Sequence, residues 1–537
     1  MPSLALTYLR PRLYPAPLLL CSALLMAQAQ AQSLPPASAP TPVPGAQDKE
    51  KVVTELENYA SSFEMNWSPV TMPTGQKTAF LGASYMVALD EDWAIGPAAY
   101  GAAQGEFGGL FTVGFNVQRR WRISKDWHAA ASLYAGAGGG VSSDRVRAGG
   151  GLMLRPELSL RREFGDWYAG VGISHITFPN GRGNIKDTGV TFTVGLSDRF
   201  LSFAPSNSGS LGRSAYATGM GFDELSLSVA AEKPRSGSFT RSGEPLTNRK
   251  NKAGADLRRY FDSGTSWWGI EASGAASGGH DGYMEILGNV GKDWGIGSER
   301  LRLGVQASAG LGGGGNMDTG SGWLLRVGPT LRWITPWGPT FRLDAGYMKA
   351  PFGHYNSLQV RGSLAVPLEK GPRIPGNNDP MELGRISTQT WFLNTPHFKN
   401  FVFKDGSRES VTGLGLGMTR SFGDTIYGVG YAGSAALGKA GAFSYGMFGL
   451  GAQTQKWNGL RFGAEALVGA AGGGGVQVGG GAVSQGELWA QWEGGSQDRL
   501  RVRVGVGQWK ALGGNKHSTP MVNFNIGWAF GTLGPAN

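Results

Sequence analysis

The chain has 537 residues, of which 89 are glycine, 17 tryptophan and 25 phenylalanine, and it carries a formal net charge of +10. Glycine at more than twice its usual share of roughly 7 per cent, together with so many aromatic residues, excludes a helical or a disordered protein and favours short strands with tight turns. The charge is mild for this length and forms no basic run, which argues against nucleic acid as a partner.

The first 31 residues predict a cleaved secretory signal peptide. Arg10 and Arg12 form a basic segment, residues 18–26 are apolar, and residues 27–31 offer small-residue cleavage sites. The apolar segment is shorter than the roughly 20 residues that a membrane-spanning helix needs. The single cysteine, Cys21, lies within this segment, so we expect neither a disulfide nor thiol chemistry in the mature chain.

Residues 32–60 predict a Pro/Ala-rich leader that ends in a short periplasmic helix over residues 48–60. From residue 61 onward the chain repeats one pattern three times, which indicates a duplicated domain. The three copies span 61–200, 224–367 and 387–531, and the linkers between them span 201–223 and 368–386.

Each copy carries a glycine tract after a strand of small residues. The tracts occupy residues 133–141, 307–315 and 466–475. They lack the Lys-Ser/Thr pair that follows a phosphate-binding loop, so we interpret them as strand kinks or flexible loop roots.

Apolar and polar side chains alternate along the best-defined segments. Val190, Phe192 and Val194 share one face of a predicted strand, while Thr191 and Thr193 share the other. The last strand, residues 522–530, shows the same pattern. This alternation predicts a sheet with one face in an apolar medium and one face in a polar medium, which a soluble sandwich would also show.

The turns and the aromatic residues favour a membrane barrel over a sandwich. Short turns near 90–93 and 124–127 alternate with longer loops, among them 234–252 and 396–410. Tryptophans gather at strand ends, at Trp93, Trp121, Trp127, Trp167, Trp294, Trp333 and Trp337. Short periplasmic turns, long outer loops and aromatic girdles are typical of Gram-negative outer-membrane barrels. We therefore expect contact with outer-membrane lipid.

The C-terminal strand resembles the β-signal that outer-membrane barrels present to their assembly machinery. The resemblance rests on the alternating residues Phe524, Ile526, Trp528 and Phe530. It implies the barrel-assembly machinery as a partner. The usual terminal phenylalanine is followed here by seven further residues, Gly531–Asn537.

The predicted fold class is all-β, a transmembrane antiparallel β-barrel of about 24 strands in three eight-stranded repeats. The strands could close as one large barrel or as three small ones. The long linkers permit three closures, whereas duplication of a small barrel is a simple route to a wide one. We slightly favour one large barrel.

One segment of the first copy resembles the His-x-Ser segment of lipid A deacylases of the PagL type. The residues are Ile173-Ser174-His175-Ile176-Thr177. The resemblance implies His175 as general base and Thr177 as nucleophile on the lipid-facing surface. Asp187 is the nearest acidic residue that could orient the histidine. The alternative, which we favour, is a histidine at the lipid–water boundary without a catalytic role.

We expect no metal and no cofactor. The six histidines have no ligand spacing, and no cysteine joins them. The polar faces of the strands carry the remaining chemistry. Candidate lumen-lining residues are Arg155, Glu157, Arg161, Arg326, Arg332, Arg342, Asp344, Glu487, Arg501 and Arg503. In a narrow barrel such groups pair and fill the interior, whereas in a wide barrel they line a channel and favour anions.

These features predict a porin-like passive channel or an export conduit, without enzymatic activity, whose cargo is a polymer or a small solute. One alternative is an outer-leaflet lipid-modifying enzyme that uses His175. Another is a structural or adhesive surface protein, for which the loops 234–252 and 396–410 are the relevant feature.

Overall fold

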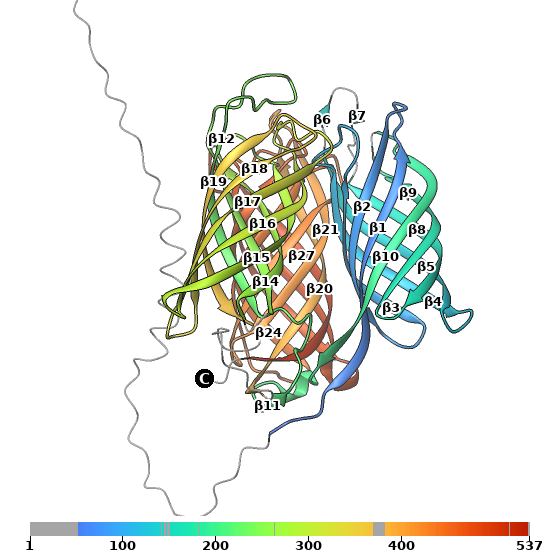
Figure 1. Cartoon of the computed structure of the whole chain (residues 1–537), viewed down its shortest axis with the longest axis vertical. Helices are drawn as coiled ribbons and strands as arrows, with labels where there is room; N and C mark the ends of the chain where they lie inside the picture. The colour runs from blue at the N-terminus through green and yellow to red at the C-terminus, as the bar shows by residue number, and fades with distance from the viewer. Residues whose placement is uncertain are drawn as a thin grey trace, which may run out of the picture. The chain divides into compact units, whose positions relative to one another are not determined.

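The structure is a computed structural model. It describes residues 52–140, 142–143, 146–147, 151–181, 183–261, 264–368, 382–514 and 516–534. The predicted signal peptide and residues 32–51 lie outside the described residues. Residues Lys51–Asn537 form one compact unit, and its strands build three separate barrels (Figure 1).

Barrel 1 is a closed sheet of eight antiparallel strands. Its first strand, β1 (Glu57–Thr71), pairs with both β2 (Lys77–Ala88) and the last strand, β10 (Lys186–Ser202). Between them run β3 (Trp93–Ala102), β4 (Phe111–Arg122), β5 (Trp127–Gly139), β8 (Leu152–Phe164) and β9 (Trp167–Thr177). The loop after β5 carries a small hairpin of β6 (Ser142–Ser143) and β7 (Val146–Arg147).

Barrel 2 closes in the same way, through pairing of β12 (Glu224–Pro234) with β19 (Asn356–Pro367). The strands between them are β13 (Lys250–Phe261), β14 (Ser266–Ser277), β15 (Met284–Ser298), β16 (Leu301–Gly313), β17 (Trp323–Ile334) and β18 (Thr340–Lys349).

Barrel 3 closes through β20 (Glu382–Val402) and β27 (Ser518–Leu533). Its other strands are β21 (Arg408–Ser421), β22 (Ile426–Leu437), β23 (Ser444–Gln453), β24 (Leu460–Gly472), β25 (Ala482–Gly494) and β26 (Leu500–Ala511). The short strand β11 (Leu211–Ser214) comes from the linker between barrels 1 and 2, yet it pairs with the start of β20. That linker also holds a 3-10 helix, η1 (Pro205–Asn207).

The all-β prediction is confirmed, but the preference for one large barrel is wrong and the three-barrel alternative is what forms. In each repeat the first and last strands pair with each other, over 11 residue pairs from Glu57↔Ser202 to Trp67↔Phe192 in barrel 1. This pairing leaves no free edge through which a repeat could join its neighbour.

Three boundaries also differ from the prediction. The helix over 48–60 does not form in its described part, because residues 57–60 extend β1 and pair with β10. Barrel 3 begins at Glu382 rather than residue 387. The loop predicted over 396–410 is mostly strand, since β20 runs to Val402 and β21 begins at Arg408.

The barrel walls show the predicted alternation. Val190, Phe192 and Val194 point outward and are 49–54% exposed, while Thr191 and Thr193 point inward and are buried. The seven tryptophans predicted for the strand ends are all exposed. They lie at the short-turn ends of their strands, which general outer-membrane topology assigns to the periplasm.

Glycine tracts bring the three barrels into contact. The tract of barrel 3 contains Gly472, the last residue of β24, where an added Cβ would lie 2.1 Å from the backbone nitrogen of Gly282 in barrel 2. The tract of barrel 2 contacts barrel 1 at Gly313, where an added Cβ would lie 2.6 Å from the backbone nitrogen of Gly109. The tract of barrel 1 meets barrel 3 at Gly139.

These three contacts are equivalent. In each case the tract at the end of the fifth strand touches the loop between the third and fourth strands of another barrel. The contacts run from barrel 1 to 3, from 3 to 2 and from 2 to 1, so they form a closed ring. The tracts are therefore close-packing surfaces, where any side chain would separate two backbones.

We predict that Gly472→Val loosens the contact between barrels 2 and 3. Hydrogen exchange should speed up in the loops 278–283 and 473–481, whereas the strands of both barrels should keep their protection. Gly446→Val is the matched control, because a Cβ at this strand position of barrel 3 meets nothing within 4 Å. Equal exchange in both variants would contradict the proposed contact.

Candidate functional site

Buried ion pairs occupy the middle of barrel 1, and a buried apolar cluster that includes Phe80 and Tyr134 lies at its long-loop end. Glu64 accepts hydrogen bonds from Arg161 Nη1 at 2.7 Å and from the Tyr168 hydroxyl at 2.6 Å. Arg155 lies 2.6 Å from Glu157. An eight-stranded barrel is just wide enough for such side chains to occupy its interior.

Barrel 2 contains a denser network of the same kind. Glu271 accepts two hydrogen bonds from Arg326, at 2.8 and 2.7 Å, and a further one from Arg361. Arg361 also donates to Asp344 at 2.6 Å.

Two further groups of ion pairs lie toward the ends of barrel 2. Nearer the long-loop end, Lys252 bridges Glu232 at 2.7 Å and Glu285 at 2.5 Å. At the other end, Asp293 lies between Arg302 at 2.5 Å and Arg332 at 2.9 Å.

All ten lumen-lining candidates face a barrel interior, and none is more than 5% exposed. The structure distributes them over three separate interiors rather than one. Arg155, Glu157 and Arg161 lie in barrel 1, Arg326, Arg332, Arg342 and Asp344 in barrel 2, and Glu487, Arg501 and Arg503 in barrel 3.

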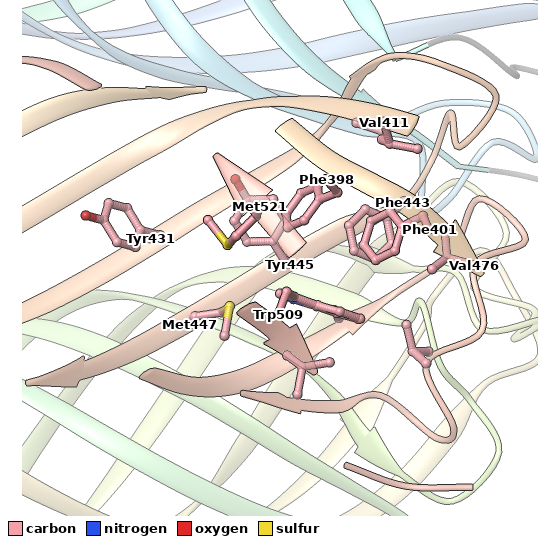
Figure 2. Close-up of a cluster of buried hydrophobic side chains, with 14 of the residues drawn as sticks. Phe398, Phe401, Val411, Tyr431, Phe443, Tyr445, Met447, Val476, Trp509 and Met521 are labelled. Carbon is pink, nitrogen blue, oxygen red and sulfur yellow. The ribbon is translucent and has the colours of Figure 1, made fainter. Parts of the chain in front are cut away.

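The long-loop end of barrel 3 is closed by buried aromatic side chains, which we call the aromatic plug (Figure 2). The plug consists of Phe398, Phe401, Phe443, Tyr445 and Trp509. The ring of Phe401 lies 5.0 Å from that of Trp509 and 5.1 Å from that of Phe443. Such edge-to-face contacts stabilise the cluster beyond simple burial.

A β-bulge explains why the alternating pattern did not reveal the plug. Phe398 and Phe401 are three residues apart, so a regular strand would place them on opposite faces. The register of β20 against β21 shifts between these two residues, and Asn400 adopts a left-handed φ of 57°. The inserted residue lets both rings point into the barrel.

Between the plug and the short-turn end, one ion pair occupies the middle of barrel 3. Arg503 forms an ion pair with Glu465 and lies 4.0 Å from the ring centroid of Trp489. Glu465 also accepts hydrogen bonds from the hydroxyls of Tyr427, at 2.7 Å, and Tyr431, at 3.1 Å. This layer has fewer charged groups than the corresponding region of barrel 2.

The short-turn end of barrel 3 holds a cavity of about 300 Å³. Polar groups form most of its wall, on the seven strands β20 to β26 and on the linker around η1. The lining residues include Ser206, Ser208, Thr388, Thr390, Thr419, Ser421, Gln453, Lys456, Arg461, Gln491, Glu493, Asp498, Arg501 and Arg503. We call this space the barrel 3 cavity.

The charged groups around the cavity form ion pairs with one another. Glu493 lies 3.0 Å from Arg461 Nε, 3.4 Å from Arg501 Nε and 2.9 Å from Gln491 Nε2. At the rim, Lys456 pairs with Asp498. The cavity therefore presents donors and acceptors together.

Sequence reasoning found only part of this cavity. It named Arg501 and Arg503 but missed Arg461, Glu493 and the hydroxyl-bearing residues. Glu493 was within reach, because it lies two residues beyond Gln491 on the same face of the predicted strand.

The segment that resembles a lipid A deacylase lies on the outer wall of barrel 1. The Nδ1 atom of His175 is 2.7 Å from the Thr188 hydroxyl on the neighbouring strand. Asp187 instead accepts backbone hydrogen bonds, from Thr71 at 2.5 Å and Thr188 at 2.8 Å. The described contacts of His175 and Asp187 thus do not join them as a base and its orienting acid.

The residues of the predicted assembly signal divide into two groups. Phe524, Ile526 and Trp528 point outward and are exposed, whereas Phe530 is 1% exposed. The ring of Phe530 packs 5.2 Å from Trp391 of the same barrel and 4.9 Å from Phe200 of barrel 1. Phe530 thus contributes to a contact between two barrels.

Over the residues that the structure describes, no group of three or more His, Cys, Asp or Glu side chains could hold a metal ion. In the same residues, no helix is long and apolar enough to span a membrane.

The outer walls define the class of protein. Large apolar side chains face outward along the strands, with Leu158 67%, Ile173 60% and Leu488 65% exposed. Such a surface is stable in hydrocarbon, and closed barrels satisfy every backbone group there. Antiparallel barrels with this outer band belong to the bacterial outer membrane. The chain is therefore an outer-membrane β-barrel protein with three barrels in one polypeptide.

Comparison with known proteins adds distant similarities only. No family model and no curated protein matches the sequence. Among solved structures, the outer membrane protein OpdK of Pseudomonas aeruginosa aligns over 89% of this chain and 99% of its own, with 9% identity and a TM-score of 0.22. The FrpB iron transporter of Neisseria meningitidis aligns over 88% and 82%, with 8% identity and a TM-score of 0.26. TM-scores this low carry no argument about function.

We predict that Glu271→Gln strongly destabilises barrel 2. The substitution leaves the guanidinium groups of Arg326 and Arg361 buried without their shared carboxylate, which costs about 3–5 kcal/mol. Urea unfolding of the purified protein in detergent micelles measures the change. Asp92→Asn is the control, because its exposed pair with Arg119 contributes at most about 1 kcal/mol. Similar losses in both variants would contradict a stabilising role for the buried network.

Proposed function

We propose that the protein moves small polar solutes across the outer membrane and that barrel 3 is the conduit. The observation that carries this proposal is the polar cavity of about 300 Å³ in the periplasmic end of barrel 3. In barrels 1 and 2, buried ion pairs occupy the middle of the interior and buried apolar clusters lie at the long-loop end. An eight-stranded interior suits a small solute and does not suit a polymer.

In this proposal the aromatic plug is the closure of the conduit. It lies at the long-loop end of barrel 3, opposite the cavity, and the Glu465–Arg503 pair lies between them. Buried apolar rings exclude water and ions from the outer half of the barrel. Opening therefore requires displacement of rings such as Phe401 and Trp509.

We predict that the double variant Phe401→Ala, Trp509→Ala conducts ions in planar bilayers. Removing two large rings opens space at the plug, so single-channel conductance should rise at least tenfold above the nearly closed wild type. Trp492→Ala is the matched control, because this tryptophan lies on the outer wall of barrel 3. A folded double variant that stays silent at all voltages would overturn the proposal.

A structural role is the second candidate, and the filled interiors of barrels 1 and 2 favour it. Such a protein would anchor or stiffen the membrane, with the long loops as its contact surface. The loop 235–249 is available for this, whereas only residues 403–407 remain of the second predicted loop. Silent bilayer recordings of the folded double variant Phe401→Ala, Trp509→Ala would favour this role.

Lipid modification by His175 stays a third, weaker proposal, supported by its place on the outer wall beside Thr188. Lipid A deacylation that disappears in a His175→Ala variant would support it, and retained activity would remove it. Outer-membrane lipid and the barrel-assembly machinery remain the proposed partners in all three cases.

A further inference from the structure

We infer that the barrel 3 cavity binds a neutral polyhydroxylated molecule of the size of a mono- or disaccharide. This inference deepens the proposed function and rests on it for the claim that solutes reach barrel 3. Binding and conduction are measured separately, so either can fail without the other.

The volume of the cavity sets the size of the ligand. At about 300 Å³ the cavity lies at the lower end of the roughly 300–1,000 Å³ that small-molecule pockets span. A single sugar ring, or two with partial exposure at the mouth, fits such a space. A polymer or a siderophore-sized molecule does not fit.

The charges around the cavity select a neutral ligand. Four basic residues line it, and each is placed against an acidic group: Lys456 against Asp498, Arg461 and Arg501 against Glu493, and Arg503 against Glu465. Asp424 also lines the cavity, and its negative charge balances the second of the two arginines that share Glu493. An ionic ligand would find no unpaired charge of opposite sign in the cavity. Burying its charge without such a partner would cost binding free energy.

The uncharged lining selects hydroxyl groups on the ligand. Thr388, Thr390, Thr419 and Ser421 contribute four hydroxyls from two adjacent strands, and Gln453 adds an amide. Hydroxyls and amides both donate and accept hydrogen bonds, as the hydroxyls of a sugar do. A polyol can therefore form hydrogen bonds with several lining groups at once. An apolar ligand would leave these groups without hydrogen-bond partners.

The test is binding of glucose and maltose to the full-length mature protein, measured by isothermal titration calorimetry in a detergent without a sugar headgroup. Inorganic phosphate and acetate are the ionic probes. We expect saturable binding of at least one sugar and no binding of the ionic probes.

The double variant Thr390→Val, Thr419→Val removes two cavity hydroxyls at nearly constant shape. We expect it to weaken sugar binding roughly three- to tenfold for each hydroxyl that contacts the ligand. Ser421→Ala provides a second cavity variant if the double variant does not fold. Thr425→Val is the control, because Thr425 is exposed on a turn at the same end of barrel 3 and does not line the cavity.

Three results would overturn the inference: no sugar binding, binding of phosphate or acetate in place of sugar, or sugar binding that the cavity variants leave unchanged. If sugar binds but the plug variants do not conduct, the cavity site stands and the proposed conduit fails. If the plug variants conduct but no sugar binds, the conduit stands and this ligand class is wrong.

Discussion

The closure of each sheet at eight strands is the constraint on which the other features of this protein depend. A strand in hydrocarbon must have every N–H and C=O group paired, so each repeat joins its first strand to its last. Closure at eight strands fixes a narrow interior, which side chains fill or which holds one small ligand. Any charge that points inward is then buried and must find its partner across the same interior, as Glu271 does with Arg326 and Arg361.

Barrel 3 uses the same frame differently from its two neighbours. All three barrels have buried apolar side chains at the long-loop end, but the cluster of barrel 3 has more aromatic rings, and its short-turn end holds a polar cavity. Its interior is therefore divided into a dry half and a wet half, with the Glu465–Arg503 pair between them. This division makes barrel 3 the candidate for solute binding and movement.

The three barrels also form a joint structure through contacts that need small residues. Glycine tracts let the backbones of neighbouring barrels approach where any side chain would intervene, as at Gly472 and Gly282. The linker strand β11 ties the connection between barrels 1 and 2 onto barrel 3. Aromatic rings add a further contact, where Phe200 of barrel 1 packs 5.6 Å from Trp391 and 4.9 Å from Phe530.

The sequence by itself determined the features that follow from the alternation of side chains along a strand, whose period is two residues. Alternation along single strands identified the outward and inward faces and the inward charges, because each of these depends on a short stretch of chain. The recurring glycine tracts identified the three repeats. Only the tertiary structure decided between one barrel and three, since closure depends on pairing between strands more than a hundred residues apart, such as β1 and β10. The same holds for the plug and the cavity. A bulge at Asn400 breaks the two-residue period and thereby brings Phe401 inward, and the cavity wall comes from seven strands and a linker.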